Sequence, residues 1–360
     1  MSYDLVRLEC DNLVIGAGIA GLVAALRLKG RTIVAAAGLG ATAISGGVLT
    51  PSLRSDGVST PSLRSDGVST PSLRSDGVST PLERDEAAEA WFLDTMLQSS
   101  CPYRAGRCMT DLMVTREGLV QDITCYRGTP VAISLDGQPA AGTVSVDAPF
   151  FRGRSCQEIA HMVESDLGLV DALASSLARV GAESYLLPPV LGVSRAAQAR
   201  SRLEKALGAE VYEYVTAPSV HGLRLQQALR DLVMKRNNVT LLETTVIDSL
   251  RDGARGRMGT KGRRAVWIEA SNLVLATGGP LTGLRVDGDR VYEPLTGTVS
   301  GDLAADLDPS FASDHRIMCR GIGSRPRADG FRDVRAIGAL ASGFGLYRAL
   351  VDGYHAGDAP

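Results

Sequence analysis

The 360-residue sequence has few cysteines, few aromatic side chains and almost no net charge. Its six cysteines, at 10, 101, 108, 125, 156 and 319, include no C-x-x-C pair. The spacing typical of an iron–sulfur cluster, a zinc site or a redox dithiol is therefore missing. The net charge of −2 gives no basic excess of the kind that marks nucleic-acid binding. We expect no metal site in this chain and no nucleic-acid partner.

Long apolar runs are missing as well. The two longest apolar stretches, 13–28 and 336–351, are interrupted by glycines and are too short to cross a bilayer. The N-terminus carries Asp4, Glu9 and Asp11 and lacks the pattern of a signal peptide. Together with the scattered thiols, these features favour a cytoplasmic protein. Any membrane contact is expected to be peripheral, at the cytoplasmic face, or through partners.

The most informative segment that is present starts at Asp11. Residues 11–28, DNLVIGAGIAGLVAALRL, predict an apolar strand, a glycine turn and an Ala-rich helix. This segment fits G-x-G-x-x-G, whose glycines permit a tight turn, let a pyrophosphate approach the backbone and let helix and strand pack. The alternative is a glycine turn that serves packing alone. The expected cofactor-binding residues are Gly16, Ala17, Gly18, Ile19, Ala20 and Gly21.

The carboxylate that usually follows the second strand of such a site is absent. In many NAD and FAD sites, an Asp or Glu about 20 residues after the first glycine holds the ribose hydroxyls. Here the predicted strand Thr32–Val34 continues into three alanines, 35–37, and no acidic residue lies between Asp11 and Asp56. This absence weakens the case for NAD binding more than the case for flavin binding, because the flavin ring system can be anchored elsewhere. Ala36 is still expected beside the cofactor.

Three further small-residue segments favour a flavin. One follows the second strand, one ends the buried strand LVLATGG, and one is a strand, glycine turn and helix near the C-terminus. Each alone is equally well explained as an ordinary loop. Their order along the chain favours FAD, since a glycine turn suits a pyrophosphate, with FMN as the alternative. The residues expected at the cofactor are Ser45, Gly46, Gly47, Ala276, Thr277, Gly278, Gly338 and Gly343.

Two other regions interrupt this pattern. Residues 50–79 are three copies of TPSLRSDGVS, which predict a mobile surface loop or, alternatively, a docking arm for a partner. Residues 82–217 carry few nucleotide-binding signals and predict helices at 82–98, 156–179 and 195–207. We therefore predict an α/β, Rossmann-like FAD-binding domain from residues 1–81 and 218–360. An α+β cap or substrate domain, 82–217, is inserted into it.

The segments GAGIAG, ATGG and the C-terminal glycine helix resemble fumarate reductase-type flavoproteins with two dinucleotide-binding domains. Residues 187–192 and 211–225 are similar to two stretches of the B subunit of anaerobic glycerol-3-phosphate dehydrogenase, P-A-V-L-G and P-P-S-V-x-G-x-R-L. The sequence departs from that family at Ala217, where Pro is usual, in the triplicated segment and in its shorter length.

The resemblance implies a flavin-bearing subunit of a membrane-associated complex. That complex would oxidise sn-glycerol 3-phosphate to dihydroxyacetone phosphate and pass electrons towards quinone, with a catalytic flavoprotein subunit and an iron–sulfur subunit as partners. It also implies that a backbone amide near Val246 meets the adenine. The alternatives are a free-standing fumarate reductase or succinate dehydrogenase-type enzyme, and a non-catalytic structural subunit.

Three residues are candidates for catalysis. Residues 218–224 combine Ser, His and Arg, which suit a phosphate or carboxylate, and His221 can move a proton near neutral pH. The alternative is a loop that begins the helix 223–234, with Arg224 on its surface. Arg316, with His315, Arg320 and Glu293, would face the ring or, alternatively, the solvent. The catalytic candidates are His221, Arg224 and Arg316.

The remaining charged side chains have simpler expectations. His161 and His355 are expected to be structural. A basic group in the segment 251–264 predicts a solvated hairpin loop, or a contact with lipid phosphates or an acidic partner. That group consists of Arg255, Arg257, Lys261, Arg263 and Arg264.

Overall fold

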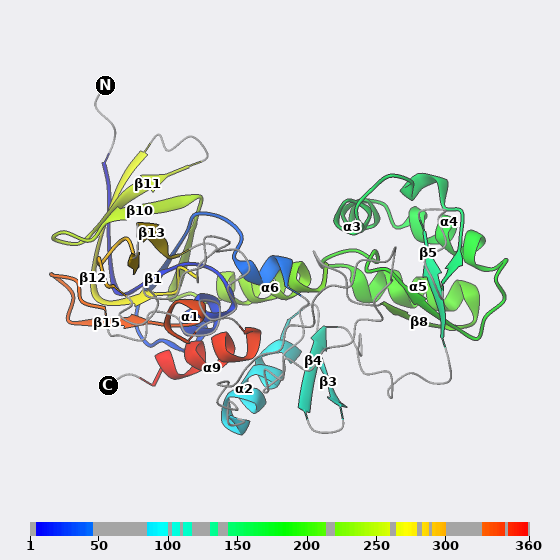
Figure 1. Cartoon of the computed structure of the whole chain (residues 1–360), viewed down its shortest axis with the longest axis horizontal. Helices are drawn as coiled ribbons and strands as arrows, with labels where there is room; N and C mark the ends of the chain where they lie inside the picture. Colours follow the sequence, from blue (N-terminus) through cyan, green and yellow to red (C-terminus); the bar gives the residue numbers. More distant parts are fainter. Residues whose placement is uncertain are drawn as a thin grey trace. The chain divides into compact units, whose positions relative to one another are not determined.

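The computed structural model describes residues 5–45, 85–99, 103–108, 111–116, 130–135, 143–213, 220–259, 264–278, 283–287, 290–299, 326–342 and 345–358. The chain divides into two compact units (Figure 1). Unit 1 consists of Met1–Thr42, Asp85–Glu89 and Leu229–Pro360, and unit 2 of Ala43–Arg84 and Ala90–Ala228. The repeats at 50–79 lie outside the described residues.

Unit 1 is built on a sheet whose centre consists of parallel strands. In spatial order they are β9 (Val239–Glu243), β2 (Thr32–Ala36), β1 (Leu5–Ile15), β12 (Arg264–Leu275) and β15 (Asp333–Ala336). In chain order this arrangement is 3-2-1-4-5, the order of a Rossmann fold. The predicted Rossmann-like α/β class is confirmed for this unit.

Two antiparallel strands extend one side of this sheet. β10 (Thr245–Ser249) pairs with β11 (Ala254–Met258), and β11 pairs with the first half of β12. The hairpin loop expected over 251–264 is therefore wrong for Ala254–Met258, which form a strand between β10 and β12. Burial alternates from one residue to the next, as in a strand with one covered face: Ala254 and Gly256 are buried, while Arg255 and Arg257 are exposed. A Cβ at Gly256 would lie 2.1 Å from the Val246 carbonyl oxygen, so the strands approach too closely for a side chain.

The helix α1 (Ile19–Arg27) follows β1 and packs against α9 (Leu346–Ala356). Small residues make this contact close. A Cβ at Gly353 would lie 2.5 Å from the Ala20 carbonyl oxygen, and one at Gly357 would lie 2.3 Å from the Arg27 Cβ. The remaining elements assigned at least partly to unit 1 are η1 (Ala41–Ile44), α2 (Glu86–Leu97), α6 (Val220–Met234), β13 (Arg285–Asp287), β14 (Arg290–Tyr292) and α8 (Ala339–Ser342).

Unit 2 has its own four-stranded sheet, with a separate antiparallel hairpin. The strands β6 (Val144–Ser145), β5 (Val131–Ser134), β7 (Ser184–Leu187) and β8 (Glu210–Glu213) are parallel in that order. The helices are α3 (Cys156–Ser165), α4 (Gly168–Leu177) and α5 (Ala196–Leu207). The short elements are the hairpin β3 (Tyr103–Cys108) and β4 (Asp111–Arg116), and η3 (Pro149–Phe151).

The sheet of unit 2 differs from the expected α+β arrangement. Parallel strands need crossover connections, and helices lie in those from β6 to β7 and from β7 to β8, so this part of the sheet is α/β. Local signals set the ends of these helices: Ser155 and Glu158 form a capping box before α3, and Gly208 ends α5 with a φ of 64°. Within the described ranges, no helix combines the length and hydropathy needed to cross a bilayer.

Candidate cofactor site

The carboxyl ends of β1, β12 and β15 meet at one edge of the unit 1 sheet. The Ala276 N–H donates to the Ile15 carbonyl (2.8 Å), and the Ile337 N–H donates to the Leu275 carbonyl (3.0 Å). The strand order reverses between β1 and β12, which is where doubly wound sheets bind ligands. This edge brings together the predicted segments 16–21 and 276–278 with Gly338.

Two glycines of the fingerprint are required by the fold itself. Gly16 has a φ of 113°, and a Cβ there would lie 2.1 Å from the Ala276 carbonyl oxygen. A Cβ at Gly21 would lie 2.0 Å from the Gly16 carbonyl oxygen. Gly16 thus joins the ends of β1 and β12, and Gly21 lets α1 approach the turn. A packing role explains both residues without a ligand.

Gly18 is different, because neither its conformation nor its packing calls for glycine. Its φ of −75° and ψ of −178° are extended backbone that any residue adopts. Among the residues that the structure describes, an added Cβ would meet only the Thr42 hydroxyl oxygen, at 3.5 Å. The space above Gly18 is therefore open, as a phosphate approaching the backbone requires.

The N-terminus of α1 is suited to an anion. Its first turn carries no acidic residue, and Gly18 caps it without a side-chain hydrogen bond. The Ile19 N–H donates to the Thr42 hydroxyl oxygen at 2.8 Å. A helix leaves its first N–H groups without intrahelical partners, and its dipole favours negative charge there. Sequence reasoning missed Thr42, which no motif marks.

Of the other predicted cofactor residues, some follow the strand ends of unit 1, some lie elsewhere in the described ranges, and three lie outside them. Ala36 ends β2, and Gly278 follows Ala276 and Thr277 with a φ of 92°. The Gly338 N–H donates to the Asp352 carboxylate at 2.9 Å. Val246 lies on β10 and is 43% exposed. Ser45 directly follows η1, whereas Gly46, Gly47 and Gly343 are outside the described residues.

The two stretches that resemble the glycerol-3-phosphate dehydrogenase family are joined inside unit 2 by a buried ion pair. Arg224 donates to both carboxylate oxygens of Glu213, at 2.5 and 3.2 Å, and to the Gly192 carbonyl at 2.7 Å. Glu213 also accepts from the N–H groups of Val190 and Leu191, at 2.7 and 2.8 Å. Sequence reasoning missed Glu213, because an isolated Glu in a strand gives no signal.

Arg224 is fully buried, so the alternative that placed it on the helix surface is wrong. The helix begins at Val220 rather than Leu223. His221 and Arg224 therefore lie in its first two turns, where both are buried. Burial raises the pKa of the Glu213 carboxyl, but the charge and hydrogen bonds of Arg224 outweigh it, and the pKa is lowered. A catalytic role for His221 and Arg224 stays a prediction, and Arg316 lies outside the described residues.

Of the four remaining candidates, Glu293 has a local role in the structure. The Glu293 carboxylate accepts from the N–H groups of Leu295 and Thr296 and thereby organises a turn. His161 is exposed on α3. His315 and Arg320 lie outside the described residues.

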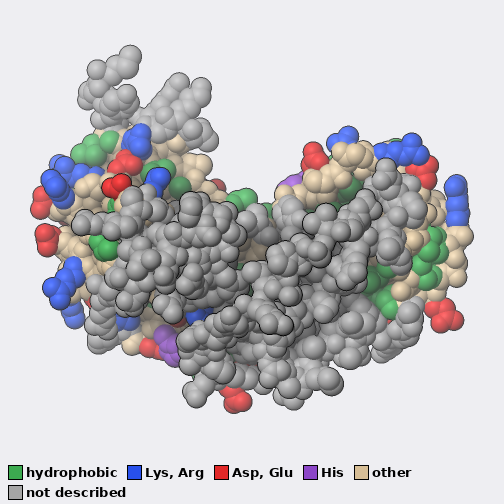
Figure 2. Space-filling model, viewed as in Figure 1, with side chains coloured by type: hydrophobic (Ala, Val, Ile, Leu, Met, Phe, Trp, Pro, Cys, Tyr) green, Lys and Arg blue, Asp and Glu red, His purple; other side chains and the backbone are tan. Residues whose placement is uncertain are grey.

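The basic group lies partly on β11 and is not a bare positive patch. Arg257 pairs with Asp248 at 3.0 Å, and the Arg255 guanidinium lies 4.8 Å from the centre of the Trp267 ring. In the face shown in Figure 2, acidic and basic side chains are interspersed over the described part of unit 1. Arg264 begins β12, and Lys261 and Arg263 are outside the described residues.

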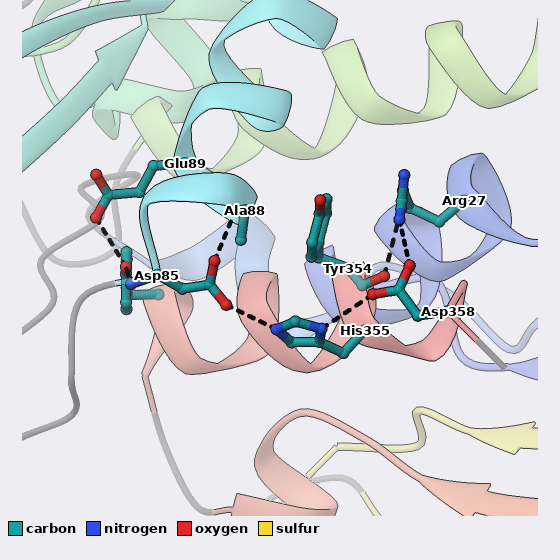
Figure 3. A network of polar contacts seen from close by, with 8 residues as sticks. Arg27, Asp85, Ala88, Glu89, Tyr354, His355 and Asp358 are labelled. Carbon is teal, nitrogen blue, oxygen red and sulfur yellow. Dashed lines mark hydrogen bonds and ion pairs between the residues drawn. The ribbon is translucent and has the colours of Figure 1, made fainter.

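A polar network joins the start of α2 to α9 (Figure 3). His355 contacts Asp85 at 2.7 Å and Asp358 at 3.1 Å, so it bridges the two carboxylates. The Tyr347 hydroxyl donates to Glu89 at 2.7 Å and accepts from the Asp85 N–H at 2.8 Å. The hydrogen bond to Asp85 is the largest cause of the raised pKa of His355. These contacts give His355 the structural role expected of it.

The sequence matches no protein-family model and no curated protein. The structure is similar to Mycobacterium smegmatis Sdh1 in complex with UQ1, at 15% identity and a TM-score of 0.27, over 76% of this chain and 34% of that one. It is similar to FrdA of E. coli quinol fumarate reductase, at 11% identity and a TM-score of 0.26, over 76% and 33%. A geranylgeranyl bacteriochlorophyll reductase-like protein from Thermoplasma acidophilum matches at 10% identity and a TM-score of 0.35, over 98% and 78%.

The chain spans about a third of the length of the first two of these proteins. At TM-scores this low, the likeness carries no inference about activity. The function proposed below rests on the geometry of the site.

Proposed function

We propose that this chain is a flavoprotein that binds FAD at the edge formed by 16–21, 276–278 and Gly338. The observation that carries the proposal is Gly18: it is a glycine that the fold does not need, placed where a pyrophosphate needs open backbone. It lies at the switch point of a sheet with Rossmann strand order, at the N-terminus of a helix free of acidic residues in its first turn.

Different groups of the chain would bind different parts of FAD. The N–H groups at the start of α1 would hold the phosphates, and Gly18 would give them access. Ala276, Thr277 and Gly338 would line the neighbouring strand ends. When bound, FAD supplies the hydride and electron-transfer chemistry, while the protein binds and orients it.

We further propose that the chain serves as a subunit of a quinone-linked oxidoreductase complex that acts on glycerol 3-phosphate. The support is the pair of family-like stretches, 187–192 and 211–225: the side chains of Glu213 and Arg224 in the second stretch hydrogen-bond to backbone N–H and carbonyl groups of the first. A fumarate reductase-type reaction is the second candidate, supported by the segments GAGIAG and ATGG. Substrate-dependent reduction of the bound flavin by glycerol 3-phosphate or by succinate, in the presence of partner subunits, distinguishes the two.

The test of cofactor binding is direct. The purified full chain is titrated with FAD and with FMN, and bound flavin is followed by absorption and by quenching of flavin fluorescence. We expect FAD to bind more tightly than FMN, because FMN lacks the pyrophosphate and the adenosine. A folded chain that binds neither flavin would overturn the proposal.

A further inference from the structure

The end of β2 carries no side chain that could bind a ribose. Where FAD and NAD sites usually carry a carboxylate, this chain has Ala36 and Ala37, followed by Gly38. A Cβ added at Gly38 would meet no atom of the described residues within 4 Å. No side chain of this tripeptide is longer than a methyl group.

The neighbouring strand supplies a carboxylate at the same level. β9 runs parallel to β2, and their registers place Glu243 directly beside Ala36. Register partners on neighbouring strands lie about 5 Å apart and share one face of the sheet. Glu243 is the last residue of β9, and its side chain is 51% exposed. It thus stands one strand away from the position that the missing acid would occupy.

The position of Glu243 is fixed from two sides. Arg230, on α6, forms an ion pair with the Glu243 carboxylate, and the arginine side chain is only 20% exposed. The Glu243 carbonyl accepts from the hydroxyls of Thr244 and Thr245, at 2.7 and 3.3 Å. Thr244 has a φ of 53°, which is rare for a β-branched residue and makes the sharp turn from β9 into β10.

We propose that Glu243 takes the place of the missing β2 acid and accepts hydrogen bonds from the ribose hydroxyls of the FAD adenosine. An ionised carboxylate has acceptor sites on both oxygens, so the pair with Arg230 leaves sites for a diol. The arginine would hold the carboxylate in position. This inference rests on the proposed FAD binding, and it names the residue that selects a ribose over its deoxy analogues.

The test measures binding of nucleotides rather than activity. FAD is titrated into the full chain, and ADP and 2′,3′-dideoxy-ADP are compared as competitors. In the unsubstituted protein ADP should compete better, because only ADP carries the two hydroxyls. Glu243→Ala should weaken FAD binding about ten- to hundredfold and should abolish the preference for ADP.

Two variants separate ribose contact from structural support. Arg230→Gln removes the ion pair and keeps the carboxylate, so it should retain the preference for ADP. Glu9→Gln removes an exposed carboxylate from the far half of β1 and should change nothing. If Glu243→Ala binds FAD as the unsubstituted chain does, or keeps the preference for ADP, the inference falls while FAD binding stands. If the unsubstituted chain binds no FAD, the proposed function falls first.

Discussion

At the residue scale, Gly18 and Gly21 belong to one motif but differ in packing: a side chain would clash with the backbone at Gly21 and not at Gly18. Gly18→Ala should cost the cofactor-free chain no more than about 1 kcal/mol of unfolding free energy, because the added Cβ would meet only the Thr42 hydroxyl oxygen among the described residues and alanine is a weaker helix N-cap than glycine. It should weaken FAD binding at least about tenfold, because the added methyl group would occupy the space that the phosphates of the proposed FAD need. Chemical denaturation and flavin titration measure the two quantities.

Gly21→Ala is the matched contrast. Its methyl group would lie 2.0 Å from the Gly16 carbonyl oxygen, so α1 must shift away from the turn. We expect a loss of unfolding free energy of about 1–3 kcal/mol, as for overpacked cores. Equal loss of stability in both variants would show that Gly18 also serves packing only.

The buried pair of Arg224 and Glu213 predicts strong coupling. Arg224→Met leaves an uncompensated buried carboxylate and should cost about 3–5 kcal/mol of unfolding free energy. Glu213→Leu combined with Arg224→Met should recover much of that loss, since no buried charge remains unpaired. Denaturant unfolding of the two single variants and the double variant measures the coupling, and additive losses would contradict it.

The same pair sets a pH dependence. The pKa of Glu213 is lowered in the folded state, so its contribution to stability is present above the pKa of the unfolded chain and is lost as the pH falls through the lower folded value. The unsubstituted protein should therefore lose stability on acidification. The Glu213→Leu, Arg224→Met double variant should show less of this loss. Unfolding midpoints measured from pH 6 downwards test the expectation.

At the element scale, the contact of α2 with α9 depends on His355. The pKa of His355 is raised, first by its hydrogen bond to Asp85, so the stabilisation is fully present below its unfolded pKa and is lost as the pH rises through the folded value. Amide exchange of residues 86–97, corrected for its intrinsic pH dependence, should show more frequent opening at pH 8.5 than at pH 5.5. His355→Gln should remove most of this difference, and an unchanged difference would contradict the assignment.

The elements also show what sequence patterns are able to predict. α1 and α9 were predictable because apolar residues, glycines and helix ends follow local rules. β11 was not, since Ala254 and Gly256 are too small to give a hydrophobic alternation between arginines. At the site, the glycine turns were predictable from spacing. Thr42, Glu213 and Glu243 were not, because their partners lie far away in the sequence.

At the scale of the whole molecule, the cofactor edge combines chain segments from both ends. β1 and β2 come from the first 36 residues, and β9, β12 and β15 come from residues 239–336. A fragment of residues 1–228 keeps all of unit 2 but lacks two strands of unit 1. These are β12, which pairs with β1, and β9, which pairs with β2. We expect limited proteolysis of this fragment to remove residues 5–42 quickly and to leave residues 143–213 protected. Equal protection of both regions would contradict this division.

The separation of β2 from β9 has a consequence for synthesis. Ala36 leaves the ribosome some 200 residues before Val239, the first residue of its neighbouring strand. At a synthesis rate of about 5–20 residues per second, roughly 10–40 s pass between the synthesis of β2 and that of β9. During that interval the residues of unit 2 emerge and can fold first. The proposed FAD site around the glycine turn would therefore be completed only late in translation, when the last third of the chain has been made.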